Sequence, residues 1–368
     1  MVRDFDLSRF PSPRPELTAV DIPEHGALDY AELECLGLSP DDVLDFSVNV
    51  NPYGPSPQVW DALGHVPLDR YPDRQALALR RALAGRLGRA PSQIAVGSGA
   101  TELIWAIALA FVRSGDRVFI VGPTFGEYRR ATSLMGGKVI EWTARPEDGF
   151  AVPDAITRIL RQTQPRVVFV CNPNNPTGVL LSPDTISEWA RSTPQALLVV
   201  DEAYIAFARG ARSAVTLSEE NVLVLRSMTK DYALAGLRLG YAVGSQRVIE
   251  ALGRALPPWS VSALAQVAGL AALGDEAYVR RSLARLAQDK EALVQGLRDL
   301  GWNPLPSATQ FFLIEVGDGA AWRRELLRHK ILVRDCASFG LPAYIRLATR
   351  RAEENARLLA VLREVLFC

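Results

Sequence analysis

The chain has 368 residues, of which 48% are hydrophobic and 22% are charged, a composition that can bury a sizeable core. Its 41 basic and 41 acidic residues balance, which disfavours nucleic acid or an anionic membrane as a partner. The four cysteines and three histidines are scattered without metal-ligand spacing, so we expect neither a disulfide framework nor a metal site.

The first 45 residues are rich in proline and charge and predict an N-terminal arm with one short helix at 29–36. The opening MVRDFDLSRF lacks the apolar core of a signal peptide. The apolar stretch at 103–112 is too short to cross a bilayer. We therefore expect a cytoplasmic protein.

Between about residues 74 and 244, helical segments alternate with short β-branched runs. Apolar periodicity predicts helices at 77–87 and 101–112. This alternation is typical of an α/β fold with a mostly parallel central sheet covered by helices on both faces. The predicted strands are 94–96, 117–121, 138–142, 166–171, 196–200 and 221–226.

The pattern changes after residue 244, where a smaller α+β domain is predicted. It begins with a long amphipathic helix at 277–300. The later elements are a strand in FFLIEV, a helix at 321–329, strands in ILVRD and YIRLAT, and a last helix at 353–366. We therefore predict an arm at 1–45 that joins the small domain, a large domain at 46–250, and a linking helix with the small domain at 251–368.

Four polar clusters follow predicted strands: GSGATE (97–102), NPNNPTG (172–178), DEAY (201–204) and SMTKDYALAGLRLG (227–240). Ligands of open α/β sheets bind outside the carboxyl ends of the strands, so these clusters are expected to converge. Taken singly, each has a plain structural explanation as a turn, a helix cap or an exposed loop lysine. GSGATE lacks the GxGxxG spacing, which disfavours a nicotinamide dehydrogenase.

The residue types in these clusters point to one kind of chemistry. GSGATE would bring backbone N–H groups to an anion at a helix N-terminus. Asp201, at the end of an apolar strand, needs a positive partner. Lys230 lies among small and apolar residues, and desolvation would make it a nucleophilic amine. Pyridoxal phosphate requires such a lysine, such an acid and a phosphate cup.

The order and spacing of NPNNPTG, DEAY and SxTK…GLRLG resemble the fold-type I pyridoxal-phosphate enzymes of the class I/II aminotransferase group, over roughly residues 45–366. The resemblance implies that Lys230 binds the cofactor covalently and moves the substrate Cα proton, while Asp201 pairs with the ring nitrogen. It implies that Asn175 and Tyr204 bond the ring hydroxyl and that Phe125 stacks on the ring. The implied phosphate ligands are Gly99, Ala100, Thr101, Ser227, Thr229 and Arg238.

The resemblance also implies a homodimer and a small phosphorylated amino acid or amine as substrate. Tyr71, in RYPD, resembles a tyrosine that reaches the partner's cofactor phosphate. Arg346 and Arg334 match arginines that bind a substrate acid group and a second substrate anion. Three further residues are placed near the substrate: Asn175, His25 and Asn51. For His25 and Asn51, an arm histidine and a turn-forming Asn-Pro are equally good explanations.

The sequence resembles two subgroups of this family, and both remain open. NPYGPSP is nearer the histidinol-phosphate aminotransferases, which would transfer an amino group to 2-oxoglutarate. Three features resemble the threonine-phosphate decarboxylases of cobalamin synthesis. They are the HG pair before DFSVNVNP, the tryptophan of LPPWSVSALAQ, and the segment RDCASFGLPAYIRLATR. We therefore expect a lyase that converts L-threonine O-3-phosphate to (R)-1-amino-2-propanol O-2-phosphate, with transamination as the alternative. A ligand-sensing half of a transcription regulator is disfavoured, because the residues before Asp45 are too few and not basic.

Overall fold

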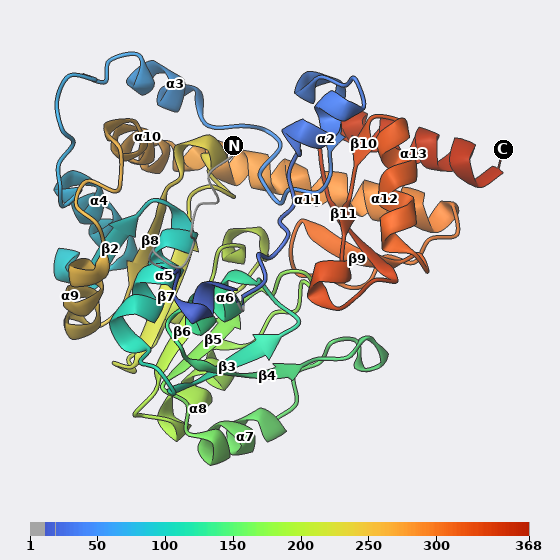
Figure 1. Cartoon of the computed structure of the whole chain (residues 1–368). Helices are drawn as coiled ribbons and strands as arrows, with labels where there is room; N and C mark the ends of the chain where they lie inside the picture. The colour runs from blue at the N-terminus through green and yellow to red at the C-terminus, as the bar shows by residue number, and fades with distance from the viewer. Residues whose placement is uncertain (1–11, 19, 368) are drawn as a thin grey trace, which may run out of the picture.

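Seven strands form the central sheet, in the order β2-β8-β7-β6-β5-β3-β4 (Figure 1). The structure is a computed structural model that describes residues 12–18 and 20–367. All six predicted strands of this sheet begin and end within one residue of their expected bounds. The strands are β2 (Ile94–Gly97), β3 (Arg117–Gly122), β4 (Lys138–Thr143), β5 (Val167–Cys171), β6 (Leu197–Asp201), β7 (Val222–Ser227) and β8 (Gly240–Val243).

The direction of the strands decides which loops meet. Strands β7, β6, β5, β3 and β4 are mutually parallel, and β8 is antiparallel to both β7 and β2. Strand β2 therefore runs in the same sense as the parallel set. The carboxyl ends of β2, β5, β6 and β7 consequently lie at one edge of the sheet, which is where the four polar clusters begin.

The two faces of the sheet pack against separate hydrophobic cores. Along β5, Val168 and Val170 belong to one core and Val167 and Phe169 to the other. Because both faces are covered, the strands read as continuous apolar runs rather than as alternating ones. The first core includes α4 (Leu77–Leu87), α7 (Ala155–Thr163), α8 (Pro183–Ser192) and α10 (Ala263–Gly274), and the second includes α5 (Gly99–Phe111), α6 (Glu127–Leu134) and α9 (Gln246–Ala255).

A smaller α+β unit lies beside the sheet and contains roughly the last quarter of the chain, from α11 onwards (Figure 1). Its antiparallel sheet has the order β11-β12-β9, and a short parallel pair joins β1 to β10. The strands are β1 (Leu44–Asp45), β9 (Phe311–Glu315), β10 (Ile331–Leu332), β11 (Arg334–Asp335) and β12 (Tyr344–Ala348). The helices are α2 (Tyr30–Cys35), α11 (Glu276–Asp299), α12 (Gly319–Arg328) and α13 (Ala352–Phe367), while α3 (Pro57–Leu63) contacts α10 of the large unit.

The two units are joined in more than one place. Residues 44–45 pair with β10, so the end of the arm packs on the small unit. The large core continues past residue 250 as far as Val279 of α11, so the chain boundaries proposed for the domains remain a prediction. Short 3-10 helices lie at Pro40–Asp42, Pro91–Gln93, Pro146–Asp148, Ile205–Phe207, Ala214–Thr216, Ala235–Leu237 and Ala337–Phe339.

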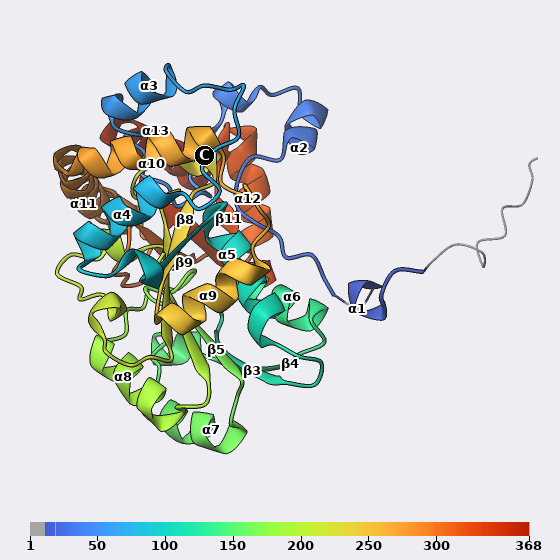
Figure 2. The same cartoon turned by 90° about the vertical axis from the view of Figure 1, so that its left-hand side faces the viewer.

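The described part of the arm crosses from the large unit to the small one (Figure 2). Helix α1 (Pro15–Thr18) lies against α6, where the Arg14 guanidinium donates to the Leu134 carbonyl at 2.9 Å. No helix between residues 12 and 367 is both long and apolar enough to cross a bilayer. The segment MVRDFDLSRF, which we expect not to be a signal peptide, lies outside the described residues.

Candidate active site

A cavity of about 510 Å³ opens where the carboxyl edge of the large sheet meets the arm and the small unit. The large unit contributes the predicted lysine together with the residues expected around it. The arm and the small unit contribute three of the residues expected to bind substrate, namely His25, Arg334 and Arg346. The predicted residues that line the cavity are His25, Thr101, Phe125, Asn175, Tyr204, Lys230, Arg238, Arg334 and Arg346.

Lys230 lies in the turn that follows β7, and its side chain reaches the cavity. Its Nζ lies 5.9 Å from the centre of the Tyr204 ring. Burial lowers the pKa of Lys230 to about 8, the charges of Arg346 and Arg238 act in the same direction, and Asp201 opposes them. A larger share of this amine is therefore neutral near pH 7 than of an ordinary lysine, which is what a nucleophile requires.

Asp201 ends β6 beneath the cavity and is 4% exposed. Its Oδ2 accepts from the Tyr128 hydroxyl at 2.7 Å and its Oδ1 from the Ala203 N–H at 3.0 Å. Burial raises the pKa of Asp201, while these hydrogen bonds and the charge of Lys230 oppose the shift. The carboxyl group is thus fixed in orientation and is suited to bind a protonated ring nitrogen.

An anion cradle lies where helix α5 begins. Gly99 has a φ of +81°, and a Cβ there would meet Arg238 Nη2 at 2.8 Å. A Cβ on Gly240 would meet the backbone nitrogen of Ala100 at 2.6 Å. The two glycines thus allow a guanidinium and the first turn of α5 to approach each other.

Two hydroxyls complete this cradle. Ser227 and Thr229 are buried, and their side-chain oxygens lie 2.6 Å apart. Arg238 itself has a φ of +56° and donates from Nη1 to the Ala235 carbonyl at 3.1 Å. Helix N–H groups, hydroxyls and a guanidinium are the donors that bind a phosphate dianion, so these residues fit the phosphate of pyridoxal phosphate.

Three side chains that were expected around the cofactor ring line the cavity. Phe125 follows the cis-proline turn after β3 and lines the cavity. Tyr204 packs edge-on against Phe311 at 4.9 Å, and burial raises the pKa of its phenol to about 12. Asn175 accepts from Arg346 Nη1 through its Oδ1. Asn175 therefore joins the cofactor side of the cavity to the substrate side.

The two predicted substrate arginines come from neighbouring strands of the small sheet, where Arg334 and Arg346 are paired residues. Arg346 is buried and donates from Nη2 to the Ser47 carbonyl at 2.5 Å. Its Nε is buried and has no hydrogen-bond partner among the described residues. Arg334 donates from Nη2 to Ser338 Oγ at 2.5 Å and to the Glu24 carbonyl at 2.8 Å. The arm therefore lies on one of the two guanidinium groups.

His25 reaches the cavity from the arm. Its Nε2 lies 3.2 Å from Glu127 Oε1, and its ring centre lies 5.3 Å from that of Phe125. Glu127 also accepts from Trp105 Nε1 at 2.8 Å. Burial acts to raise the pKa of Glu127, but its hydrogen bonds with His25 and Trp105 and the charge of Arg130 leave it lowered.

Neither Asn51 nor Tyr71 is among the residues that line this cavity. The Asn51 amide donates to the Asp231 carbonyl at 3.0 Å and to Ser282 Oγ at 2.8 Å. Tyr71 is 82% exposed and lies against Trp259, with their ring centres 4.9 Å apart. Substrate binding by Asn51 and a contact of Tyr71 with a partner subunit both remain predictions.

Several residues that line the cavity or lie behind its wall were not anticipated from the sequence. Tyr128 comes three residues after Phe125 in GPTFGEY, at the start of a helix after a strand, and that position was the available signal. Asn49, whose Nδ2 lies 3.4 Å from the Tyr204 hydroxyl, precedes the predicted Asn51 by two residues. Glu127 and Trp105 had no sequence signal, because their role depends on the path of the arm.

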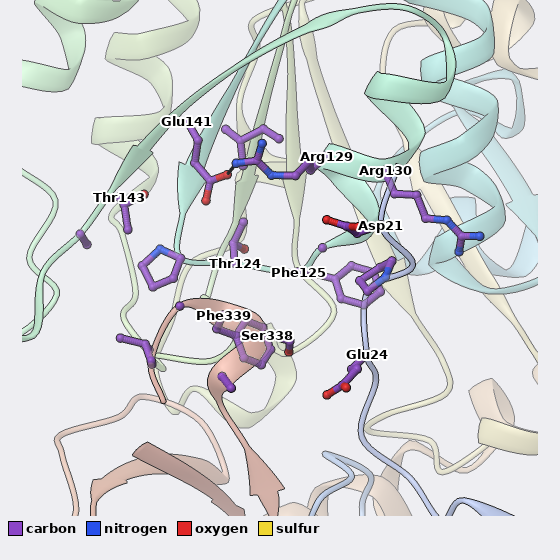
Figure 3. A pocket seen from close by; sticks show the side chains of 18 of the residues that line it. Asp21, Glu24, Thr124, Phe125, Arg129, Arg130, Glu141, Thr143, Ser338 and Phe339 are labelled. Carbon is purple, nitrogen blue, oxygen red and sulfur yellow. Dashed lines mark hydrogen bonds and ion pairs between the residues drawn. The ribbon is translucent and has the colours of Figure 1, made fainter. Parts of the chain in front are cut away.

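A wider open cleft of about 1300 Å³ continues outward from the cavity (Figure 3). Phe125 and Glu24 from the large unit and the arm face Phe339 and Ser338 of the small unit across it. Arg129 points to Glu141 and forms an ion pair with it. Residues of the arm, the large unit and the small unit line both the cavity and the cleft, so we interpret the cleft as the entrance to the cavity.

Comparison with known proteins supports the class that this geometry indicates. Residues 41–362 match the family described as aminotransferase class I and II. The chain is 35% identical over 337 residues to a histidinol-phosphate aminotransferase of Moorella thermoacetica, covering 88% of this chain and 86% of that protein. A histidinol-phosphate aminotransferase of Sinorhizobium meliloti, solved with pyridoxal-5'-phosphate, has a TM-score of 0.86 at 26% identity, covering 98% of this chain and 99% of that one. An L-threonine-O-3-phosphate decarboxylase of Porphyromonas gingivalis has a TM-score of 0.76 at 28% identity, covering 87% and 98%.

The fold and the site are those of a fold-type I pyridoxal-phosphate enzyme. More specifically, the chain belongs to the class I and II aminotransferase family. The resemblance, the fold class and the cofactor predicted from the sequence are thereby confirmed. The similarity to histidinol-phosphate aminotransferases supports the alternative activity better than the decarboxylation that was expected first.

Proposed function

We propose that this protein is an aminotransferase that exchanges an amino group between histidinol phosphate, or a closely similar phosphorylated amine, and a 2-oxo acid such as 2-oxoglutarate. The curated relative at 35% identity is aligned over 86% of its length and carries that activity in its name. The structure with a TM-score of 0.86 carries the same name. Both support transamination over decarboxylation.

The observation that carries the proposal is the pair of guanidinium groups in the same cavity as the lysine. Arg346 and Arg334 are 4% and 6% exposed, and both line the cavity with Lys230. A buried guanidinium is costly unless an anion or hydrogen-bond acceptors satisfy it, and Arg346 keeps one unpartnered nitrogen among the described residues. Two such groups suit a reaction whose substrates carry a phosphate and a carboxylate.

Each of these side chains has a distinct part in the proposed reaction. Pyridoxal phosphate, when bound, supplies the electron sink. Arg346 would hold the carboxylate of the 2-oxo acid, and Arg334 would hold the phosphate of the amine. Lys230, with a pKa lowered to about 8, would carry the proton at the substrate Cα near neutral pH. Asp201 would bind the protonated ring nitrogen, and Tyr204 and Asn175 would bond the ring hydroxyl.

We also propose that the chain is a homodimer in which Tyr71 reaches the partner's cofactor phosphate. Tyr71 is largely exposed and lies outside the cavity of its own chain, beside Trp259. Sedimentation of the holoprotein tests the dimer. Tyr71→Phe should weaken cofactor binding without dissociating the protomers, and unchanged cofactor affinity would refute the proposed contact.

Decarboxylation of L-threonine O-3-phosphate is the second candidate, and the arm favours it. His25 and Gly26, the HG pair of that resemblance, both line the cavity. A Cβ on Gly26 would meet the Ser47 carbonyl oxygen at 2.5 Å, so this glycine lets the arm pass directly over Ser47. The same arginines and lysine would serve this reaction if the carboxylate, rather than the Cα hydrogen, lay perpendicular to the cofactor ring.

A paired assay separates the two reactions. Holoenzyme receives histidinol phosphate with 2-oxoglutarate, and glutamate is followed. In parallel it receives L-threonine O-3-phosphate alone, and released CO2 is trapped. Glutamate without CO2 supports the proposal, whereas CO2 without any need for a 2-oxo acid refutes it in favour of the decarboxylase.

A separate experiment tests whether Arg334 binds the phosphate of the amine substrate. Wild-type enzyme should prefer histidinol phosphate over histidinol, and Arg334→Gln should reduce that preference by roughly 100-fold, since a charge-assisted contact to an anion is lost. A variant that keeps the full preference would show that Arg334 does not bind the phosphate.

A further inference from the structure

The backbone that presents Lys230 belongs to neither a helix nor a strand. Strand β7 ends at Ser227, and Lys230 lies in the turn at 228–232 that precedes the 3-10 helix Ala235–Leu237. Carbonyl groups in such a turn are not paired by a regular ladder and need other partners. The position of a long side chain depends on its backbone, so whatever fixes this turn also limits where Nζ can lie.

Asn51 bonds the two peptide groups that follow the lysine. Its backbone N–H donates to the Lys230 carbonyl at 2.9 Å, which also accepts from the Ala233 N–H at 3.2 Å. Its side-chain Nδ2 donates to the Asp231 carbonyl at 3.0 Å. A single residue, 180 positions away in the sequence, therefore fixes consecutive carbonyls of the lysine turn.

The Asn51 amide is itself held in one orientation. Its second Nδ2 hydrogen points to Ser282 Oγ at 2.8 Å, and Ser282 in turn donates to the Val279 carbonyl at 2.9 Å. Its Oδ1 accepts from the Tyr53 N–H at 3.1 Å. A carbonyl only accepts and a backbone N–H only donates, so the partners determine which end of the amide is oxygen and which is nitrogen.

These contacts also join the turn to the long helix that leads into the small unit. Ser282 lies on α11, and Asn51 is only 2% exposed between that helix and the turn. The Tyr278 hydroxyl of α11 donates to the Tyr53 carbonyl at 2.7 Å, which anchors the segment after Asn51. The lysine turn is therefore braced against α11 by a side chain whose hydrogen-bonding groups are already occupied.

We propose that Asn51 is a positioning residue for Lys230. It sets the backbone from which Nζ attacks the aldehyde carbon of pyridoxal phosphate, a step that forms the nitrogen–carbon double bond and releases one water. It likewise sets where the same nitrogen lies during proton transfer. The inference concerns the cofactor, which every reaction of this family uses, and does not depend on which substrate the enzyme takes.

The test measures attachment of the cofactor to cofactor-free protein, with no substrate present. Asn51→Asp keeps an acceptor for the Tyr53 N–H but removes both amide donors, and Asn51→Ala removes the whole amide. Quenching of tryptophan fluorescence reports binding of pyridoxal phosphate, and the visible absorption band reports the covalent bond. We expect similar binding but roughly 10-fold slower bond formation, with kcat lowered to a similar degree and KM changed less than about 2-fold, because small displacements of a reacting group cost rate rather than affinity.

Two further variants keep the test decisive. Asn221 also donates from Nδ2 to backbone carbonyls, those of Ala190, Thr193 and Ala196, but lies elsewhere, so Asn221→Ala is the matched control. It should lower thermal stability and leave attachment unchanged. Ser282→Ala removes only the far contact of the Asn51 amide and should slow attachment by about 2- to 3-fold. This milder variant remains informative if Asn51→Ala does not fold.

The proposal is overturned if Asn51→Asp attaches the cofactor at the wild-type rate, or if Asn221→Ala slows attachment equally. The first result would reduce Asn51 to a structural brace, and the second would attribute the effect to general loosening. Absence of transaminase activity in the wild-type enzyme would leave these attachment rates unaffected, so the two proposals fail separately.

Discussion

The side of the cavity that we propose for the cofactor (the cofactor side) and the side that we propose for the substrate (the substrate side) are built in different ways. Asp201, Ser227 and Gly99 directly end or follow strands of a single sheet, so neighbouring strands fix their relative positions. Arg334 and Arg346 come from the small sheet, and His25 comes from the arm. The first side is one rigid edge, whereas the second is assembled from three separate segments of the chain.

The contacts of each side reflect this difference. The Asp201 carboxylate is fixed by Tyr128 and by its own chain two residues on. Arg346 instead donates to Ser47, and Arg334 to Glu24, which lie about 300 residues earlier in the sequence. We therefore expect changes on the cofactor side to impair every reaction of the enzyme, and changes on the substrate side to alter its choice of substrate.

Replacing Lys230 tests the cofactor side most severely. Lys230→Ala should lower kcat by roughly 1000-fold or more, because it removes both the covalent anchor and the proton carrier. Borohydride reduction followed by peptide mapping should label Lys230 in wild type and no residue in the variant.

The matched control is Lys290, whose pKa burial also lowers to about 8. Its Nζ is occupied by the carbonyls of Ser307 and Thr309, each at 2.6 Å. Lys290→Ala should keep the label on Lys230. A label on any other lysine in Lys230→Ala protein would contradict the assignment.

Replacing Arg346 tests the substrate side. Arg346→Ala should reduce kcat/KM for the 2-oxo acid by roughly 100-fold while cofactor attachment persists, because a buried charged contact is lost. Arg323→Ala is the control, since Arg323 also pairs with a carboxylate, that of Glu32 at 2.7 Å, but is not among the residues that line the cavity. If cofactor attachment failed together with substrate binding in Arg346→Ala, the two sides would not be separable.

The pH dependence of attachment links the two sides. Only the neutral amine reacts, so the rate should rise about tenfold per pH unit up to the pKa of Lys230, about 8, and then level off. An ordinary lysine would continue to rise to about 10.5. Because Arg346 helps to lower this pKa, Arg346→Ala should move the inflection to higher pH. Stopped-flow measurement between pH 6 and about 10 covers the range. An inflection at the pKa of an ordinary lysine would show that burial does not activate the amine.

The difference between the two sides of the cavity also explains which features the sequence could predict. NPNNPTG, DEAY and the lysine segment each contain their strand, their turn and their polar groups within a few residues, so local patterns suffice. Strand β8 was not predicted, because GYAV lies directly after the GLRL segment. The antiparallel direction of β8 gives β2 the same sense as β7, and no local pattern carries that information.

Positions that depend on distant segments were harder to assign. Asn51 was predicted near the substrate, with a turn-forming Asn-Pro as the alternative explanation, but its partners Asp231 and Ser282 are roughly 180 and 230 residues away, which only the fold discloses. His25 was placed near the cavity only through the family resemblance. Its contact with Glu127 depends on the path of the arm.

The smallest expected effect comes from Tyr128, beneath the cofactor side. Burial and the Asp201 charge raise the pKa of Tyr128 well above its ordinary value, so the phenol stays protonated and donates to the carboxylate. A hydrogen bond to a charged group contributes about 1.5–3 kcal/mol, of which only the part that differs in the transition state affects kcat. Tyr128→Phe should therefore lower kcat by roughly 3- to 10-fold, with little change in KM.

The control for Tyr128 is another buried phenol that bonds a carboxylate. Tyr344 donates to Glu315 at 3.3 Å in the small sheet, and Tyr344→Phe should leave kcat unchanged. The phenol of Tyr128 also opposes the rise in the pKa of Asp201, so its loss should raise that pKa further and weaken the hold on a protonated ring nitrogen. A shift in the pH titration of the visible absorption band would register this change, whereas a purely structural role for Tyr128 would lower thermal stability and leave the titration in place.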